Sequence, residues 1–287
     1  MKKNFFKPIY IYFYITVFLL TTFLYYGCFS NANSLKEIEL RVHFIDVGQG
    51  DASLIQFNNK SILIDAGPDE NSSNLIKYLK SCKVETLDYV IATHPHEDHI
   101  GAMDEVLDKF KVNNFIMPKT SDSSKYFEDM ANSLMKHNIT PIEAKKGVNF
   151  LLNDKINCSI IAPNSSSYEN LNDYSAVLKL TYNDLSFLFT GDAEAISENE
   201  MINNNYNLNS QILKVGHHGS NSSTSKNFLN NVKPKIAIIS CAASNSYGHP
   251  SKEVLKYLSE FNVKILRTDR EDTIVLSSDG TNIYKLK

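Results

Sequence analysis

The sequence has few cysteines and no excess of basic residues, and each shortage excludes a class of protein. Only four of the 287 residues are cysteine. Beyond the first 30 residues, Cys82, Cys158 and Cys241 lie at wide, unpatterned spacings, so neither a disulfide framework nor a Cys-x-x-Cys metal knuckle can be read from them. We expect them to be small buried residues. With 43% apolar and 21% charged residues, the composition does not fit a disordered, collagen-like or coiled-coil chain.

The charged residues are unevenly distributed. The chain has 29 Lys and Arg against 32 Asp and Glu, a formal charge of −3. Because the first 28 residues hold three lysines and no acidic residue, the remainder has 26 basic and 32 acidic residues, a charge of −6. This excludes a strongly basic protein that coats nucleic acid. A local basic groove is still compatible with the composition, and Lys214 or Lys226 could compensate for the acidity there.

The first 30 residues have the pattern of a targeting segment. A short basic stretch precedes Ile9–Tyr26, an uncharged run of 18 residues, which is at the border between a signal-peptide core and a membrane-spanning helix. The basic flank predicts that everything after it is exported, either to the extracellular face of the membrane or as a secreted protein. Gly27-Cys28 resembles a bacterial lipoprotein cleavage site. We therefore expect a signal peptide or membrane anchor at 1–30, with Cys28 as a lipidation site, a linker at 31–37, and one domain at 38–287.

Strand and helix patterns alternate through the rest of the chain, in two comparable halves of roughly 38–150 and 151–287. Predicted strands lie at 40–46, 53–57, 61–65, 88–93, 114–117, 156–161, 176–181, 185–190, 212–215, 236–240, 263–267, 273–276 and 283–286. Predicted helices lie at 71–81, 101–110, 124–138, 196–206, 225–232 and 251–260. Two sheets packed together, with helices outside, would bury all the apolar faces. This predicts an α/β (α+β) sandwich.

The segment THPHEDH (93–99) is the strongest candidate for chemistry, and it directly follows an apolar strand. A turn at a strand end lets several imidazoles converge on one point, so His94 and His96 can bind one cation while Asp98 and His99 face a second. Three histidines and an aspartate within six residues are improbable by chance in a chain with eight histidines. The segment is therefore interpreted as a metal site rather than a solvated polar loop.

Further acidic and histidine side chains follow other predicted strands. Asp192 comes after a strand and a glycine, and it is a natural bridge between two cations. In KVGHHGS (214–220), one histidine can complete a metal shell and the other can hydrogen-bond a substrate anion. His249, in NSYGHP (245–250), can be a ligand, a proton donor or an ordinary loop residue. Asp65 ends a strand and is expected to orient a ligand histidine from behind.

In these motifs the chain resembles the metallo-β-lactamase-fold hydrolases, and more narrowly the extracellular hydrolase domain of the ComEC family of DNA-uptake proteins. The matching segments are FIDVGQGDA (44–52), 93–101, 172–180, 188–192, 213–220 and 240–250. They extend over about residues 40 to 287. The resemblance implies an αββα four-layer sandwich, in which two mixed β-sheets are flanked by helices and the metals lie at one sheet edge.

The resemblance also implies roles for the site residues. The implied metal ligands are His94, His96, Asp98, His99, Asp192 and His218. The implied catalytic residues are Asp98, His217 and His249, the two histidines lying near the substrate. The wider fold has another ligand histidine where this chain has Asn172-Asp173-Tyr174-Ser175, as ComEC-like members commonly do. One metal shell is therefore expected to be incomplete.

The predicted reaction is metal-dependent hydrolysis. Two divalent cations sharing a water would lower its pKa to about 7, and the mixed donors suit Zn²⁺ but also Mn²⁺ or Fe²⁺. We expect a phosphodiester substrate such as DNA, because of the ComEC resemblance and the polar cluster at 220–223. The membrane is a further expected partner, through the N-terminal segment. Two alternatives stay open: a hydrolase of another ester, such as a phosphorylcholine ester, lactone or β-lactam, and a non-catalytic DNA-binding component of an uptake machinery.

Overall fold

Side chains on both faces of most strands are buried, because two β-sheets pack face to face and helices cover each of them. A computed structural model describes residues 40–287. The expected signal peptide or anchor, Cys28 and the linker at 31–37 lie outside the described residues. Between residues 40 and 287, none of the helices combines the length and the apolar character needed to span a bilayer.

The first sheet mixes antiparallel and parallel pairs. Its strands lie in the order β17 (Ile283–Lys285), β16 (Ile274–Ser278), β1 (Leu40–Phe44), β2 (Ser53–Phe57), β3 (Lys60–Ile64), β5 (Tyr89–Ile91), β7 (Phe115–Pro118) and β8 (Ile142–Ala144). From β3 to β8 the pairs are parallel, because the chain returns through crossover connections between them. The other pairs are antiparallel.

The second sheet repeats this mixture. Its strands lie in the order β15 (Lys264–Arg267), β14 (Ile236–Ile239), β13 (Ile212–Lys214), β12 (Leu185–Phe189), β11 (Val177–Tyr182), β10 (Ile156–Ala162) and β9 (Asn149–Asn153). The pairs from β12 to β15 are parallel and those from β9 to β12 are antiparallel. A separate short pair joins β4 (Thr86–Leu87) to β6 (Lys111–Val112).

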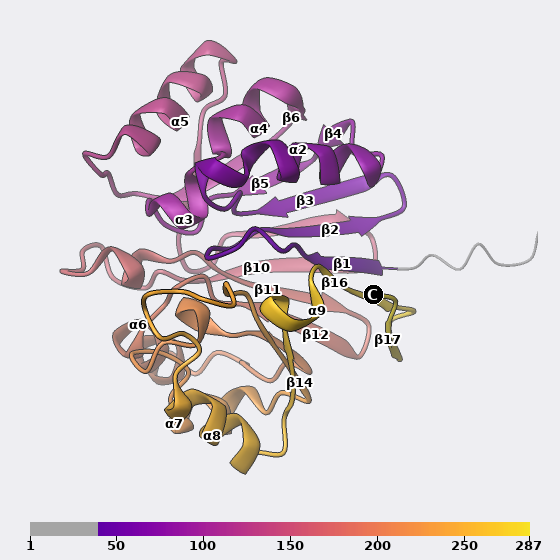
Figure 1. Cartoon of the computed structure of the whole chain (residues 1–287), viewed down its shortest axis with the longest axis vertical. Helices are drawn as coiled ribbons and strands as arrows, with labels where there is room; N and C mark the ends of the chain where they lie inside the picture. Colours follow the sequence, from indigo (N-terminus) through magenta and orange to yellow (C-terminus); the bar gives the residue numbers. More distant parts are fainter. Residues whose placement is uncertain (1–39) are drawn as a thin grey trace, which may run out of the picture. The chain divides into compact units, whose positions relative to one another are not determined.

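Helices form the two outer layers, as Figure 1 shows. The first sheet is covered by α2 (Ser72–Ser81), α4 (Met103–Lys109) and α5 (Lys125–Lys136), and the second by α6 (Ala195–Asn203), α7 (Lys226–Val232) and α8 (Lys252–Glu260). Ser124, Ser225 and Ser251 cap α5, α7 and α8 by accepting a hydrogen bond from the backbone N–H three residues on. The connections contain α3 (Glu97–Ile100), α9 (Thr268–Glu271), and the 3₁₀ turns η1 (Asp69–Asn71), η2 (Leu171–Tyr174) and η3 (Gly216–Gly219). The predicted αββα four-layer sandwich is confirmed.

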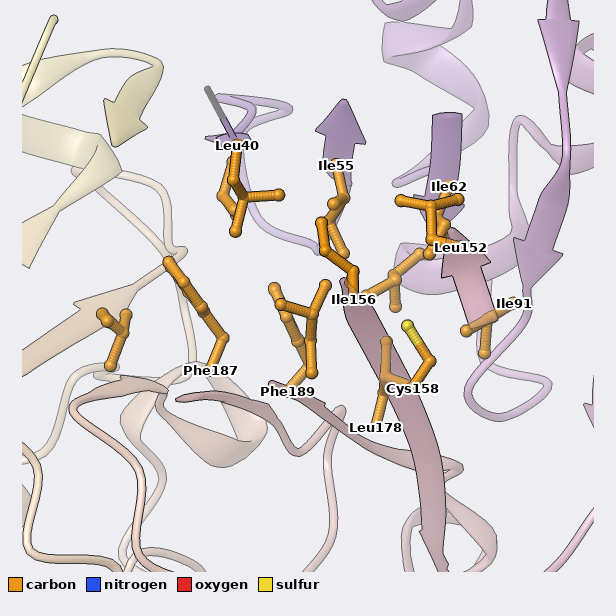
Figure 2. Close-up of a cluster of buried hydrophobic side chains, with 14 of the residues drawn as sticks. Leu40, Ile55, Ile62, Ile91, Leu152, Ile156, Cys158, Leu178, Phe187 and Phe189 are labelled. Atoms are coloured by element: carbon orange, nitrogen blue, oxygen red, sulfur yellow. The ribbon is translucent and has the colours of Figure 1, made fainter. Parts of the chain in front are cut away.

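An apolar layer fills the space between the two sheets. Figure 2 shows side chains of the first sheet, such as Leu40 and Ile55, pointing toward Phe187 and Phe189 of the second. The rings of Phe44 and Phe189 stack with centroids 5.9 Å apart. Each fully buried side chain of this size stabilises the fold by roughly 1.5–3 kcal/mol, so this layer holds the sheets together.

The expected division of the chain into halves at 38–150 and 151–287 does not match the division into two sheets at the C-terminal strands. β16 and β17 extend the first sheet, with β16 paired to β1, whereas the preceding strands belong to the second sheet. Without β16, β1 would be an unpaired edge, which natural sheets avoid. The strands β8 and β9 were not predicted, because both lie at sheet edges where exposed positions interrupt the apolar alternation. Cys158 and Cys241 are buried as expected, but Cys82 is partly exposed.

Candidate metal centre

The predicted site residues meet where strands from both sheets end. Asp65 follows β3, and the segment 93–99 follows β5 in the same sheet. Asp192 follows β12, and the pair His217 and His218 follows β13 in the second sheet. Because β3 and β5 are parallel neighbours, as are β12 and β13, their carboxyl ends deliver these side chains to one edge of the sandwich.

Four imidazoles direct their Nε2 atoms toward one buried carboxylate, that of Asp192. His99 Nε2 is 3.1 Å from Oδ1 of this carboxylate. The Nε2 atoms of His218, His217 and His94 are 3.6, 3.7 and 4.0 Å from Oδ2. Asp192 is therefore placed to contact a cation bound by these histidines.

Two more predicted ligands complete this arrangement. Asp98 Oδ2 lies 3.1 Å from His218 Nε2, and His96 Nδ1 lies 3.0 Å from His94 Nε2. One donor atom from each of Asp98, His99, Asp192 and His218 lies within 4.8 Å of all the others. The six predicted ligands thus form two neighbouring groups that share Asp192.

In the four imidazoles around Asp192, the opposite ring nitrogen, Nδ1, faces an oxygen. The partners are Asp65 for His99 (2.8 Å), the carbonyl oxygen of Ser240 for His218 (3.0 Å), Glu194 for His217 (3.0 Å), and the hydroxyls of Thr93 (3.1 Å) and Ser175 (3.4 Å) for His94. Thr93 in turn donates its hydroxyl and backbone N–H to Asp65. Such partners fix the tautomer and ring orientation of metal-binding histidines, and here they leave Nε2 free for a cation.

Two buried polar atoms at the centre show that the site fits a cation. His99 Nε2 and Asp192 Oδ1 face each other at 3.1 Å, yet neither makes a hydrogen bond to any described residue. An unsatisfied buried polar atom costs about 1–3 kcal/mol, and a divalent cation bound by both would remove that cost. Mixed imidazole and carboxylate donors are the set that Zn²⁺, Mn²⁺ and Fe²⁺ accept.

The electrostatic environment differs between the two groups of ligands. Burial alone would lower the pKa of His99 and His218, but the carboxylates around them, Asp192 first, outweigh it. The pKa of His99 is raised well above its usual value, and that of His218 is raised to about 10. For His94 burial dominates, helped by the charge of His99, and its pKa lies well below the usual value. Negative potential is therefore concentrated on the His99 and His218 side.

The backbone at the centre takes conformations that side chains rarely adopt. His217 and His218 have φ of 47° and 51°, two successive left-handed residues between Gly216 and Gly219. Left-handed positions of this kind cost of order 1–3 kcal/mol each and cluster at functional sites. Gly191 also has a positive φ, and a Cβ there would lie 2.9 Å from Cβ of Thr93, so only glycine lets Asp192 approach this closely.

The expectation that Lys214 or Lys226 offers positive charge to a substrate is wrong. Lys214 is 2% exposed, and its Nζ lies 2.6 Å from Oδ2 of Asp51. Lys226 instead pairs with Glu260 on the surface. Asp51 was not predicted as a site residue, although its other oxygen lies 3.4 Å from His218 Nδ1. Burial raises the pKa of Asp51, but Lys214 and His218 outweigh it and keep the carboxyl ionised.

Glu194 is a second residue that sequence reasoning missed. Its Oε1 accepts hydrogen bonds from Asn172 Nδ2 and from the hydroxyl of Ser222, each at 3.0 Å, beside its contact with His217. Asn172, in the segment where the wider fold has a ligand histidine, thus holds Glu194. The signal available in the sequence was an acidic residue two positions after Asp192.

An open cavity of about 530 Å³ lies over the centre. Its lining residues are Gln49, Pro68, Glu70, His96, Glu97, Asp98, Asp192, His217, His218, Tyr247 and His249. The ring of His249 is 5.3 Å from that of His217. Burial, followed by the charges of His217 and His218, lowers the pKa of His249 to about 4, so this imidazole is neutral at pH 7.

The chain matches a family profile and several curated proteins. The profile of the metallo-beta-lactamase superfamily matches residues 45–243. ComE operon protein 3 of Bacillus subtilis (strain 168) is 32% identical over 254 residues, which cover 82% of this chain and 33% of that protein. Competence protein ComA of Neisseria gonorrhoeae is 29% identical over 255 residues, with 88% and 34% covered. The chain thus spans about a third of the length of these two curated relatives.

Solved structures share the fold at low sequence identity. The metallo-beta-lactamase fold protein YhfI from Bacillus subtilis is 13% identical, with 86% of this chain and 99% of that chain covered and a TM-score of 0.55. Igni18, a metallo hydrolase from Ignicoccus hospitalis KIN4/I, is 16% identical, with 82% and 98% covered and a TM-score of 0.52. From its sequence profile, its homologues among the ComEC-like competence proteins and its four-layer fold, the chain belongs to the metallo-β-lactamase superfamily.

Proposed function

We propose that this chain is an exported, metal-dependent phosphodiesterase that acts as a nuclease of the ComEC-like type. The observation that carries hydrolysis is the convergence of four imidazole Nε2 atoms on Asp192 beneath an open cavity. The phosphodiester substrate is supported by relatives whose names refer to competence, in Neisseria gonorrhoeae, and to recombination, in Haemophilus influenzae. Both are processes that act on DNA.

The chain's own residues would hold two divalent cations. The ligands are His94, His96, Asp98, His99, Asp192 and His218, with Asp192 shared, and Zn²⁺ suits this donor set as do Mn²⁺ and Fe²⁺. When bound, the cations would supply Lewis acidity toward a phosphoryl oxygen and a water of lowered pKa. Asp65 and the Ser240 carbonyl keep His99 and His218 oriented for this task.

His217 is the proton donor in this proposal. Glu194 accepts a hydrogen bond from its Nδ1, and Nε2 faces the cavity from a side chain that is 25% exposed. The carboxylate of Glu194 orients the ring with Nε2 toward the cavity, where a proton on Nε2 would lie within reach of the leaving oxygen. His249, neutral at pH 7, would hydrogen-bond a phosphate oxygen. A further catalytic role for Asp98, which lines the same cavity, stays a prediction.

The proposed enzyme acts outside the cytoplasm. The uncharged run Ile9–Tyr26 and its basic flank support export, with the domain on the extracellular face of the membrane or released from it. Protease added to intact cells should digest the domain. Lipidation at Cys28 should add mass that Cys28→Ala removes.

Hydrolysis assays on the full chain, supplied with Zn²⁺ or Mn²⁺, test the function. We expect chelator-sensitive cleavage of single-stranded DNA and of bis(p-nitrophenyl) phosphate. Cleavage only of a β-lactam, a lactone or a phosphorylcholine ester would identify a different hydrolase. DNA binding with no hydrolysis of any of these substrates would identify a non-catalytic uptake component and overturn the proposal.

A further inference from the structure

An aromatic side chain at the mouth of the cavity has no structural explanation. Tyr247 is 70% exposed, more than any other large apolar or aromatic side chain between residues 40 and 287. It lines the cavity over the metal centre, and its exposed ring covers no apolar core. An exposed aromatic ring beside a candidate site is a common contact for a ligand with its own flat surface.

The ring of Tyr247 continues a series of nearly parallel rings that begins at the metal centre. His218, which is buried at the centre, and His249 have ring centroids 6.4 Å apart and an interplanar angle of 26°. His249 and Tyr247 follow at 5.8 Å and 22°. The series runs from the buried centre to the exposed mouth, so a planar group lying on Tyr247 would extend it outward.

The loop that carries Tyr247 is fixed by its own hydrogen bonds. Asn245 Nδ2 donates to the carbonyl oxygens of Ala242 (2.9 Å) and His249 (2.6 Å), and Asn245 Oδ1 accepts from His249 N (2.9 Å). Gln49, from the loop after β1, accepts from Ala242 N at 3.1 Å. A ring presented by a braced loop loses little conformational freedom when a ligand stacks on it.

Apart from the cations proposed at its floor, the cavity offers a nucleic acid strand little electrostatic attraction, which favours stacking as a further source of binding. Among the described residues that line it, none is lysine or arginine, while Glu70 and Glu97 add negative charge beside the ligands. A polyanion therefore gains no attraction from side chains here, apart from the histidines. Stacking on an aromatic ring contributes about 1–3 kcal/mol per base and tolerates any base sequence. It requires an unpaired base, because the faces of a base in a duplex are already covered.

We propose that Tyr247 is a stacking platform for the nucleobase next to the phosphodiester at the metal centre, and that the site takes single-stranded nucleic acid. This inference rests on the proposed nuclease function and adds the form of its substrate. It also assigns a specificity role to a residue outside the ligand set.

The test compares a normal oligonucleotide with one that lacks bases. The full chain, Tyr247→Phe, Tyr247→Ala and Tyr284→Ala are supplied with Mn²⁺ and given single-stranded DNA or a matched strand of abasic residues. We expect Tyr247→Ala to raise KM for the normal strand about 10-fold, with no change on the abasic strand. Tyr247→Phe should keep the wild-type KM. Tyr284→Ala, which removes another exposed tyrosine on β17, should leave both substrates unaffected. Equal KM for Tyr247→Ala and wild type on the normal strand, or equal losses on both strands, would overturn the platform.

A second readout separates this inference from the proposed function. The fluorescence of a 2-aminopurine base in single-stranded DNA is quenched by stacking, and it can be followed whether or not the strand is cut. Quenching by wild type and Tyr247→Phe but not by Tyr247→Ala, in the absence of cleavage, would support the platform and defeat the nuclease. If the protein cleaves DNA but neither the quenching nor KM depends on Tyr247, the nuclease would be supported and the platform defeated.

Discussion

The two sides of the metal centre are built differently. On one side His99 and His218 are buried and surrounded by carboxylates, which raise the pKa of both imidazoles. On the other side burial keeps His94 neutral, His96 is partly exposed to the cavity, and the segment at 172–175 supplies no ligand histidine. Since only the first side concentrates negative charge, we expect it to hold a cation tightly and the His94 side to hold one more weakly, nearer to the substrate.

Removing the shared carboxylate should have the largest effect, because Asp192 serves both sides. We expect Asp192→Asn to lose both cations and to lower kcat/KM by roughly 10³-fold or more. Metal content by mass spectrometry and the rate on bis(p-nitrophenyl) phosphate measure the two effects. Asp88→Asn, which removes a buried carboxylate paired with Lys60, is the matched control. Retention of both cations by Asp192→Asn would show that the two sides do not depend on a common bridge.

Single ligand substitutions should separate the two sides. His96→Ala should lose the weak cation and keep the tight one, whereas His218→Ala should lose the tight one. Competition with a chelator, followed by metal counting, should then show about a 10- to 100-fold difference in the affinity of the remaining cation. Equal affinities in the two variants would contradict the proposed asymmetry.

The role of His217 can be resolved by measuring rate and metal content together. We expect His217→Ala to lower kcat by roughly 10²-fold with the full complement of cations retained, because the side chain would act as a proton donor. Glu194→Gln should lower kcat by about 10-fold through the orientation of the same ring. If His217→Ala instead lost one cation, His217 would belong to the metal shell on the His94 side, where a ligand histidine is missing.

Two buried carboxylates near the centre have different partners, and this difference affects stability rather than catalysis. Asp65 contacts the imidazole of His99, whereas Glu198 is buried and accepts hydrogen bonds from the backbone N–H groups of Thr224 and Ser225. Burial is the main cause that raises the pKa of Glu198 from 4.5 to about 7. A raised carboxyl pKa stabilises the fold at low pH, and that stabilisation is lost as the pH rises from about 4.5 through 7.

Urea unfolding of the metal-free protein at pH 5 and pH 8 measures this loss. We expect the free energy of unfolding to fall by up to about 3 kcal/mol more in wild type than in Glu198→Gln. Glu128→Gln, at an exposed position of α5, should behave as wild type. If the free energy of unfolding had the same pH dependence in Glu198→Gln and wild type, ionisation of Glu198 would not destabilise the folded protein.

Local patterns predicted most of the fold, and the exceptions have a physical cause. Helix caps at Ser124 and Ser225 and apolar runs such as β12 are local signals, so these elements were predicted close to their observed bounds. The edge strands β8 and β9 bury little surface and leave little periodicity to read. The site residues in 93–99 were found because metal donors are dense there. Asp51 and Glu194 were missed because each is a single acidic residue whose partners come from distant segments.

The sequence by itself determined the donor types, their placement after strands and a sandwich of two sheets with helices outside, because composition and period are properties of the chain alone. The αββα four-layer class was implied by the family resemblance. Only the tertiary structure decided that β16 pairs with β1, that Lys214 forms an ion pair with Asp51, and that Glu194 contacts Nδ1 of His217. It also placed Tyr247 at the end of a row of rings that starts at His218. The reason is that these contacts join segments far apart in sequence, whose meeting depends on how the two sheets pack and not on any local pattern.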